Sequence, residues 1–356
     1  MNPVYIIAEA GVNHNGSLAT AFKLVDAAVK AGADAVKFQS FKAHKLVTAT
    51  AKKADYQHRN QNDGKSQLEM LKALELSEAE QLQLFHYCQT QAIDFLSSPF
   101  DAQSCAFLLH KLGLDTIKLG SGELTNAQLL IQISQAKVKL ILSTGMSTLE
   151  DIHQALAILA YGYSHSEAPA SSDDFSTAYQ STQGKALLQQ YVTLMHCTTE
   201  YPCPVNEVNL AAINTLKKHF SLPCGYSDHT RGIHISVAAA ALGVPVIEKH
   251  FTLDQSLPGP DHKASIEADS LAQLVHQVRD IEQALGNKHK QVTASEEKNR
   301  QIARKGLYAA TKIKKGERFT QNNIILKRPV CRTTGFDYWD IIGQPAEQDY
   351  LMDEPI

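Results

Sequence analysis

The sequence predicts a (β/α)8 barrel followed by a small β-rich module. Short apolar runs alternate with longer stretches in which apolar residues recur at helical spacing, and this pair repeats eight times before residue 286. Such alternation is typical of βαβ units and a parallel sheet, and eight units in that length fit a closed barrel. An open, doubly wound sheet is the alternative, which we rank lower because open sheets of eight parallel strands are less common.

The eight apolar runs are the predicted strands. Each has the length of a buried strand and ends in polar residues. In chain order they are residues 5–10, 35–39, 93–98, 116–121, 139–144, 191–197, 223–228 and 245–251. Helical periodicity fills the segments between them, for example at residues 19–29 and 152–159.

Two connections are unusually long. Residues 41–65 follow the second strand and are polar with mixed charge, so we expect them on the catalytic face, where they could act as a lid. Residues 162–184 follow a helix and should lie on the opposite face, as a mobile excursion without chemistry.

The domain organisation follows from this pattern. We expect a catalytic barrel over residues 1–285, a polar, lysine-rich linker over 286–300 and a β-rich module over 301–356. A module of that size is marginal alone, so it should dock on something else.

Bulk composition excludes several classes of protein. Hydrophobic residues make up 44% of the chain and the net charge is -3, which gives no electrostatic reason to expect nucleic acid or a membrane surface as a partner. No apolar run reaches about 18 residues, and we expect no secretory signal. The six cysteines form no CxxC pair, which indicates free thiols in a cytoplasmic protein rather than a cysteine zinc site.

Catalytic groups of a (β/α)8 barrel project from the carboxyl ends of its strands. Here every predicted strand ends in polar residues. At one strand these could be ordinary polar residues at the start of a loop, but that explanation does not account for all eight strands. The candidates are Glu9, Lys37, Gln39, Lys118, Ser121, Glu123, Ser143, Thr199, Tyr201, Ser227, His229, Glu248, His250 and Asp261.

Cations and hydroxyl groups among these candidates predict a site for an anionic, phosphate-bearing substrate. Lys37, Lys118, Ser121 and Ser143 supply them. Lys118 has another interpretation, as the Schiff-base lysine of an aldolase. The second lysine favours anion binding.

His229 and His250 end adjacent predicted strands and could converge on one divalent metal ion. Their separation is not a local ligand motif, so the barrel geometry carries this prediction. Glu248 shares a strand face with His250, which suits a general base. Glu9, Glu123 and Asp261 remain as acceptors for the hydroxyl groups of a polyol. For His14 and His196 a structural role is as good an interpretation as a functional one.

Nine ordered motifs resemble the sialic acid synthase family. They include Val36-Lys37-Phe38-Gln39, Ser227-Asp228-His229-Thr230 and Glu248-Lys249-His250-Phe251, and the others lie at residues 7–16, 97–100, 118–123, 142–146, 196–202 and 259–261. Residues 313–317 and 327–329 resemble the antifreeze-like (SAF) domain of that family. An ice-binding role for this module is the alternative from another class, and the charged residues around it argue against that role.

The resemblance implies condensation of phosphoenolpyruvate with an amino sugar, with release of phosphate. It also implies a divalent metal cofactor, Mn2+ first, with Mg2+ or Co2+ as alternatives. Two groups of the family compete. The main expectation is an N-acetylneuraminate synthase acting on N-acetylmannosamine, and the alternative is an N,N'-diacetyllegionaminate synthase acting on 2,4-diacetamido-2,4,6-trideoxy-mannose.

The resemblance also implies a role for each candidate residue. His229 and His250 would bind the metal and act in catalysis with Glu248 and Glu9. Phosphoenolpyruvate would contact Lys37, Gln39, Lys118, Ser121, Ser143, Thr199 and Ser227, and the sugar would contact Glu9, Glu123, Tyr201, Asp261 and Arg328. The family implies a domain-swapped homodimer in which Arg328 serves the other subunit's site. Two departures weaken individual contacts: Thr199 stands where the family often has Asn, and the turn after Pro329 is altered.

Overall fold

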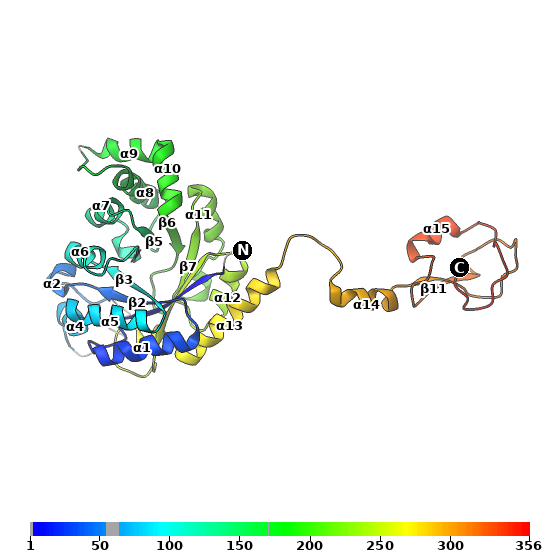
Figure 1. Ribbon diagram of the computed structural model, residues 1–356, viewed down its shortest axis with the longest axis horizontal. Coiled ribbons are helices and arrows are strands. Elements are labelled where there is room, and N and C mark those ends of the chain that lie inside the picture. The colour runs from blue at the N-terminus through cyan, green and yellow to red at the C-terminus, as the bar shows by residue number, and fades with distance from the viewer. Residues whose placement is uncertain (1–2, 55–63, 170) are drawn as a thin grey trace. The chain divides into compact units, whose positions relative to one another are not determined.

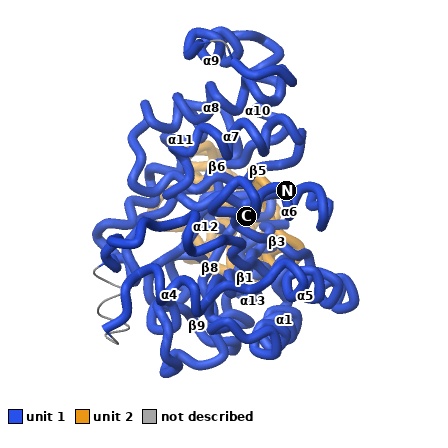
Figure 2. The backbone as a smooth tube through the Cα atoms, turned by 90° about the vertical axis from the view of Figure 1, so that its left-hand side faces the viewer, with its two compact units in different colours: residues 1–286 blue, residues 287–356 orange. Residues whose placement is uncertain are grey.

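The computed structural model describes residues 3–54, 64–169 and 171–356. The chain forms two compact units, unit 1 (Met1–Gly286) and unit 2 (Asn287–Ile356), which Figure 2 distinguishes by colour. Each unit is described by itself. Within the described ranges, no helix is long and apolar enough to cross a membrane.

Unit 1 is the predicted barrel. Its strands are β1 (Tyr5–Gly11), β2 (Ala35–Ser40), β3 (Asp94–Pro99), β4 (Thr116–Leu119), β5 (Lys139–Ser143), β6 (Val192–His196), β7 (Cys224–Asp228) and β8 (Val246–Thr252). They pair in parallel in the order β3-β2-β1-β8-β7-β6-β5-β4, and β3 and β4 at the two ends are in contact, so the sheet is nearly closed. The barrel is confirmed, every predicted strand lies within two residues of an observed one, and the open-sheet alternative is wrong.

Helices cover the outside of the strands (Figure 1). Sequence signals fix several helix ends: Ser17 caps α1 by accepting from the backbone amide of Thr20, and Gly32, with φ of 79°, ends it. The described helices of unit 1 are α1 (Leu18–Ala31), α2 (Ala43–Leu46), α4 (Gln67–Leu74), α5 (Glu78–Thr90), α6 (Ala102–His110), α7 (Ala127–Gln135), α8 (Leu149–Ser164), α9 (Ser172–Gln180), α10 (Thr182–Tyr191), α11 (Ala212–Phe220), α12 (His234–Ala241) and α13 (Ala268–Leu285).

Alternate strand residues point to opposite sides of the barrel wall. Outward-facing residues such as Ile6, Ala8 and Ile247 pack with the helices in the main core. Inward-facing residues form a separate apolar cluster inside the barrel: Ile7, Ala35, Leu96, Ile141, Met195 and Val246. The interior is therefore a packed core that supports the side chains at the carboxyl ends of the strands.

Residues 162–184, predicted as a mobile excursion, are largely helical rather than an irregular loop. This segment holds the end of α8, all of α9 and the start of α10, and α9 packs on α8. Phe175 of α9 meets Tyr161 of α8 edge to face at 5.5 Å, and Ala178 is buried. Ser171 begins α9 with a capping box. The serines and aspartates that suggested a loop are the residues that start a helix.

The predicted lid and the predicted linker also contain helices. Residues 41–65 include α2, while residues 55–63 of the predicted lid lie outside the described residues. The second half of the segment 286–300 belongs to α14 (Ala294–Ala303), which Thr293 begins with a capping box.

Unit 2 is small and built on a hairpin. Strand β10 (Gly306–Ala309) pairs antiparallel with β11 (Ile324–Lys327), and α15 (Tyr338–Ile341) lies nearer the C-terminus. Its core consists of seven buried residues: Leu307, Ala309, Ile313, Phe319, Ile324, Ala346 and Tyr350.

Candidate active site

A layer of polar side chains lies directly above the apolar layer inside the barrel. Two positions after Ile7 comes Glu9, and two positions after Val246 comes Glu248. The corresponding positions of the other strands hold Lys37, Ser98, Lys118, Ser143, Cys197 and Ser227. All eight line a cavity of about 290 Å3 at the carboxyl ends of the strands. The strand pleat alone thus assembles the floor of the site.

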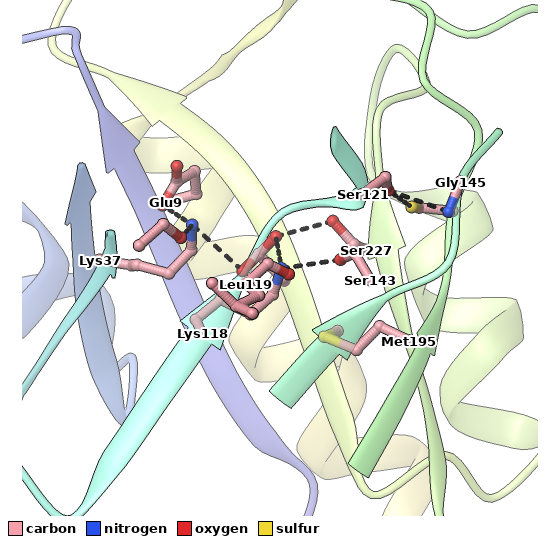
Figure 3. Close-up of polar contacts among 12 residues, drawn as sticks. Glu9, Lys37, Lys118, Leu119, Ser121, Ser143, Gly145, Met195 and Ser227 are labelled. Carbon is pink, nitrogen blue, oxygen red and sulfur yellow. Dashed lines mark hydrogen bonds and ion pairs between the residues drawn. The ribbon is translucent and has the colours of Figure 1, made fainter. Parts of the chain in front are cut away.

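Two lysines and two carboxylates alternate across this floor (Figure 3). Lys37 Nζ lies 2.8 Å from Glu9 Oε2 and 3.5 Å from Glu248 Oε2. Lys118 Nζ lies 3.6 Å from Glu248 Oε1 and donates a hydrogen bond to Ser143 Oγ at 2.7 Å. All four charged groups are buried. Glu248 is therefore held between two ammonium groups, whereas Glu9 has one.

This asymmetry separates the two carboxyl groups. Burial alone would raise the pKa of Glu248, but Lys118 and Lys37, with the Ser227 hydroxyl, hold it down to about 2. Burial dominates at Glu9 and raises its pKa to about 7, although Lys37 opposes the shift. Burial also lowers the pKa of Lys118. Near neutral pH, Glu248 is a fixed anion and Glu9 can exchange a proton.

Hydroxyl groups and a backbone amide gather beside Lys118. Ser121 Oγ accepts a hydrogen bond from the amide of Gly145 at 2.9 Å (Figure 3). Thr199 Oγ1 is buried and has no hydrogen-bond partner among the described residues. A Cβ at position 145 would lie only 2.4 Å from Thr199 Oγ1 and 2.8 Å from Ser121 Oγ, so the glycine keeps this corner free. An ammonium group with several donors suits an anionic group such as phosphate or carboxylate.

His229 and His250 lie together, with ring centroids 5.5 Å apart. Burial lowers the pKa of His229 to about 4 and holds the pKa of His250 well below its usual value, so both rings are neutral. His229 Nδ1 donates to the carbonyl of Thr198 at 2.6 Å, which leaves Nε2 with its lone pair. His250 Nδ1 is buried and unpartnered in the described part of the chain.

Neutral imidazoles, which each keep one nitrogen lone pair, fit a divalent metal ion. Ser227 Oγ lies 3.3 Å from His229 Nε2. No group of three His, Cys, Asp or Glu side chains within the described ranges could hold an ion. His229 and His250 would therefore need water or substrate oxygens to complete the coordination.

Polar groups from three segments converge around Gly11. Gln39 Nε2 donates to Glu9 Oε1 at 3.3 Å. A Cβ at Gly11 would lie 3.2 Å from that oxygen, 3.4 Å from Gln39 Nε2 and 3.7 Å from Asp261 Oδ2. Burial raises the pKa of Asp261 to about 6. The ring of Tyr201 packs against both imidazoles. This region suits the hydroxyl groups of a sugar.

The structure brings together all but two of the predicted site residues. Glu123 lies in the turn after β4, accepts a hydrogen bond from Asn126 Nδ2 at 2.7 Å and does not line the cavity. Arg328 belongs to unit 2 and directly follows β11. His14 and His196 bond to backbone atoms and are likewise not part of the lining. The turn that points Ser121 inward carries Glu123 away from the cavity.

Sequence analysis missed one side of the cavity, which we call the apolar wall. It consists of Val12, Leu46, Met70, Leu71, Leu74 and Phe100. Met70, Leu71 and Leu74 have the spacing of one face of α4, a pattern that could have predicted an apolar helix face. What that face covers depends on the fold.

A buried ion pair lies behind the two imidazoles, on the outer face of the strands. Lys249 Nζ is 3.1 Å from Asp228 Oδ2, and neither side chain is exposed. Asp228 also accepts from Thr230 and Ser236, and Lys249 donates to the carbonyl of Thr230. Asp228 precedes His229 and Lys249 precedes His250, so this network fixes the backbone that carries both rings.

An eight-stranded parallel barrel with buried lysines, carboxylates and neutral imidazoles at the carboxyl ends of its strands defines a barrel enzyme. Residues 24–290 match the model of the NeuB family. The chain belongs to this family.

Similar proteins extend the match to the whole chain. It is 46% identical to an N,N'-diacetyllegionaminic acid synthase of Campylobacter jejuni, covering 100% of this chain and 99% of that protein. It is 41% identical to the synthase of the same name from Legionella pneumophila, covering 95% and 89%. A solved N-acetylneuraminic acid (sialic acid) synthetase from Leptospira borgpetersenii, in complex with citrate, matches with a TM-score of 0.68 and 31% identity over 84% of this chain and 90% of that one.

Proposed function

We propose that this chain condenses phosphoenolpyruvate with 2,4-diacetamido-2,4,6-trideoxy-mannose and releases phosphate. The observation that carries the proposal is the floor of the cavity, where Lys37 and Lys118 flank the fixed anion Glu248 beside two neutral imidazoles. The choice of sugar rests on the relatives: the synthases at 46% and 41% identity are named for diacetyllegionaminic acid. This reverses the order of the two sugars expected from sequence, since N-acetylmannosamine becomes the alternative.

The reaction joins two carbons and breaks one carbon–oxygen bond. C3 of phosphoenolpyruvate attacks the sugar aldehyde, and the aldehyde oxygen takes up a proton. Water adds at C2 and releases a proton that balances the one taken up. The C2–oxygen bond to phosphate then breaks to leave a ketone, and phosphate departs with the second proton of the water. Lys118, Ser121, Ser143 and Thr199 hold the carboxylate and phosphate. Ser227 and Lys37 are the other groups that contact phosphoenolpyruvate in this proposal.

Proton transfer falls to Glu9 rather than Glu248. With a pKa of about 2, Glu248 is a weak base and serves to orient the two lysines. With a pKa of about 7, Glu9 carries a proton that it can give to the aldehyde oxygen. Asp261 and Tyr201 hold the sugar. Gln39, which the resemblance assigns to phosphoenolpyruvate, joins them in this proposal because it donates to Glu9 Oε1 at 3.3 Å.

His229 and His250 would hold a divalent cation, with Mn2+ as the proposed ion. A bound divalent ion polarises a carbonyl group as a Lewis acid. We expect His229→Ala and His250→Ala each to abolish Mn2+ binding in titration calorimetry while the circular dichroism spectrum stays that of the folded protein. Full Mn2+ affinity in either variant would remove that residue from the ligand set.

Phosphate release with phosphoenolpyruvate and a panel of amino sugars tests the proposed function. The diacetamido-trideoxy sugar should support turnover with a higher kcat/KM than N-acetylmannosamine. A higher value for N-acetylmannosamine would restore the main expectation from sequence, and no release with any amino sugar would reject both.

We propose further that unit 2 is an antifreeze-like (SAF) module and that the chain acts as a domain-swapped homodimer in the cytoplasm. The small core of unit 2, with seven buried apolar residues, supports a need for docking. Arg328 would serve the other subunit's sugar site.

A further inference from the structure

The cavity has two chemically different ends. Its anion-binding groups come from β4, β5 and the segment after β6, through Lys118, Ser143 and Thr199. The apolar wall lies at the ends of β1, β2 and β3: Val12 directly follows β1, Phe100 directly follows β3, and both cluster with residues of α4. In the strand order, β8 and β7 with the two imidazoles lie beside β1, on the side opposite β3.

With the proposed condensation, this arrangement indicates a direction for the sugar. The aldehyde carbon must meet phosphoenolpyruvate near Lys118 and the imidazoles. The polar groups along the sugar would then pass Glu9, Gln39 and Asp261, which meet around Gly11, and the end farthest from the aldehyde, C6, would reach the apolar wall.

The apolar wall offers C6 few hydrogen-bonding groups. Met70 is 2% exposed and Leu74 is 7% exposed, and both line the cavity with half-buried Leu71. Gln67, one turn earlier on α4, is the polar side chain that this helix adds to the lining. A hydroxyl group pressed against such a wall loses its water without gaining a partner, whereas a methyl group gains by burial.

We infer that the apolar wall, with Met70 at its centre, binds the C6 methyl group of the sugar and makes the enzyme selective for 6-deoxy sugars. The inference rests on the proposed function, because it takes the condensation for granted and specifies one position of its substrate. Met70, Leu71 and Leu74 are specificity-determining residues on this account.

Two sugars that differ in one oxygen test the inference: 2,4-diacetamido-2,4,6-trideoxy-mannose and the same sugar with a 6-hydroxyl group. The wild-type kcat/KM should favour the 6-deoxy sugar by about 10- to 100-fold, the range in which an apolar pocket rejects an added hydroxyl group. Met70→Gln, which keeps the side-chain length, should reduce this ratio about tenfold. Leu71→Gln should reduce it in the same direction, and its half-buried position makes it the safer variant for folding. Lys72→Gln, on the exposed side of α4, is the matched control and should keep the wild-type ratio.

The outcomes separate this inference from the proposed function. Turnover of both sugars with a wild-type ratio near one overturns the inference and leaves the condensation intact. An unchanged ratio in folded Leu71→Gln also overturns the inference. A Gln67→Leu variant that loses activity on the 6-hydroxy sugar alone overturns it too, since Gln67 would then bind that hydroxyl group. No phosphate release with either sugar is the failure of the proposed function.

Discussion

At the scale of single residues, the two buried carboxyl groups differ because they have different neighbours. Glu248 lies between Lys37 and Lys118, while Glu9 pairs with one lysine, Lys37. Strand alternation predicts that all four side chains point into the barrel, and sequence analysis selected all four. The sequence prediction of Glu248 as general base and the proposed role of Glu9 differ because the counter-charges around a carboxylate depend on distances between strands that are far apart in the chain.

The pKa of Glu9 gives a prediction for the pH profile. If protonated Glu9 supplies the proton to the aldehyde oxygen, kcat falls as pH rises through about 7, where the buried carboxyl loses its proton. Glu9→Gln should lower kcat by about 100-fold or more and abolish this limb of the profile. Initial rates from pH 5.5 to 9 check both. A limb near pH 7 that survives in Glu9→Gln belongs to another group.

The same pKa affects stability in a defined direction. The pKa of Glu9 is raised from 4.5 to about 7, so the folded state holds the proton more tightly than the unfolded chain. Its contribution to the free energy of unfolding is present below pH 4.5 and is lost as pH rises through about 7.

Lys118 gives the second prediction at this scale. Lys118→Met removes a buried charge-assisted contact to phosphoenolpyruvate, which typically costs about 2–5 kcal/mol, so KM for phosphoenolpyruvate should rise about 30-fold or more. KM for the sugar should change far less. The Schiff-base alternative predicts instead that borohydride traps substrate on Lys118, and mass spectrometry of the treated protein distinguishes the two.

At the scale of the elements, β7 and β8 are held together behind the site by the Asp228–Lys249 pair. Removing one partner of a buried ion pair leaves an unpaired charge, at a cost of about 3–5 kcal/mol. Lys249→Met should therefore lower the free energy of unfolding by about that amount, measured by urea denaturation. Lys263→Met, a lysine of the same barrel outside the network and exposed, is the control and should change it little. An unfolding free energy for Lys249→Met within 1 kcal/mol of wild type would contradict the structural role, by comparison with the cost cited above.

Most strands and barrel helices could be predicted at this scale, but α9 and α14 could not. Both are polar, α9 with serines and aspartates and α14 with charged and amide side chains, and such a composition resembles that of loops. The capping boxes at Ser171 and Thr293 were the available signal. For α9, Phe175 and Ala178 stabilise the helix through contacts with α8 that no local pattern reveals. The apolar wall was missed for the same reason, since α4 shows its apolar face in sequence but not the cavity beneath it.

At the scale of the whole molecule, the sequence motifs divide between a large barrel and a small unit built on one hairpin. The barrel carries every described side chain that lines the cavity, and the family resemblance predicts that one residue of the site, Arg328, comes from unit 2. Ile324-Ile325-Leu326 runs along β11 and fixes the backbone immediately before this arginine. The prediction of a swapped dimer depends on partner contacts, which a single sequence does not encode as a local pattern.

Mixed dimers decide whether Arg328 acts on its own subunit or on the other. Arg328→Ala and His250→Ala should each be inactive as homodimers, the first through the sugar and the second through the metal. If Arg328 acts in trans, a heterodimer of the two has one site with both defects and one site with neither, because the intact arginine comes from the His250→Ala subunit. Mixing the two inactive proteins should then restore activity, up to about half of the wild-type value per heterodimer by this count of sites. Native mass spectrometry establishes that heterodimers have formed. Heterodimers without activity would place Arg328 at the site of its own subunit or outside any site, and a monomeric wild-type enzyme with full activity would remove the swap altogether.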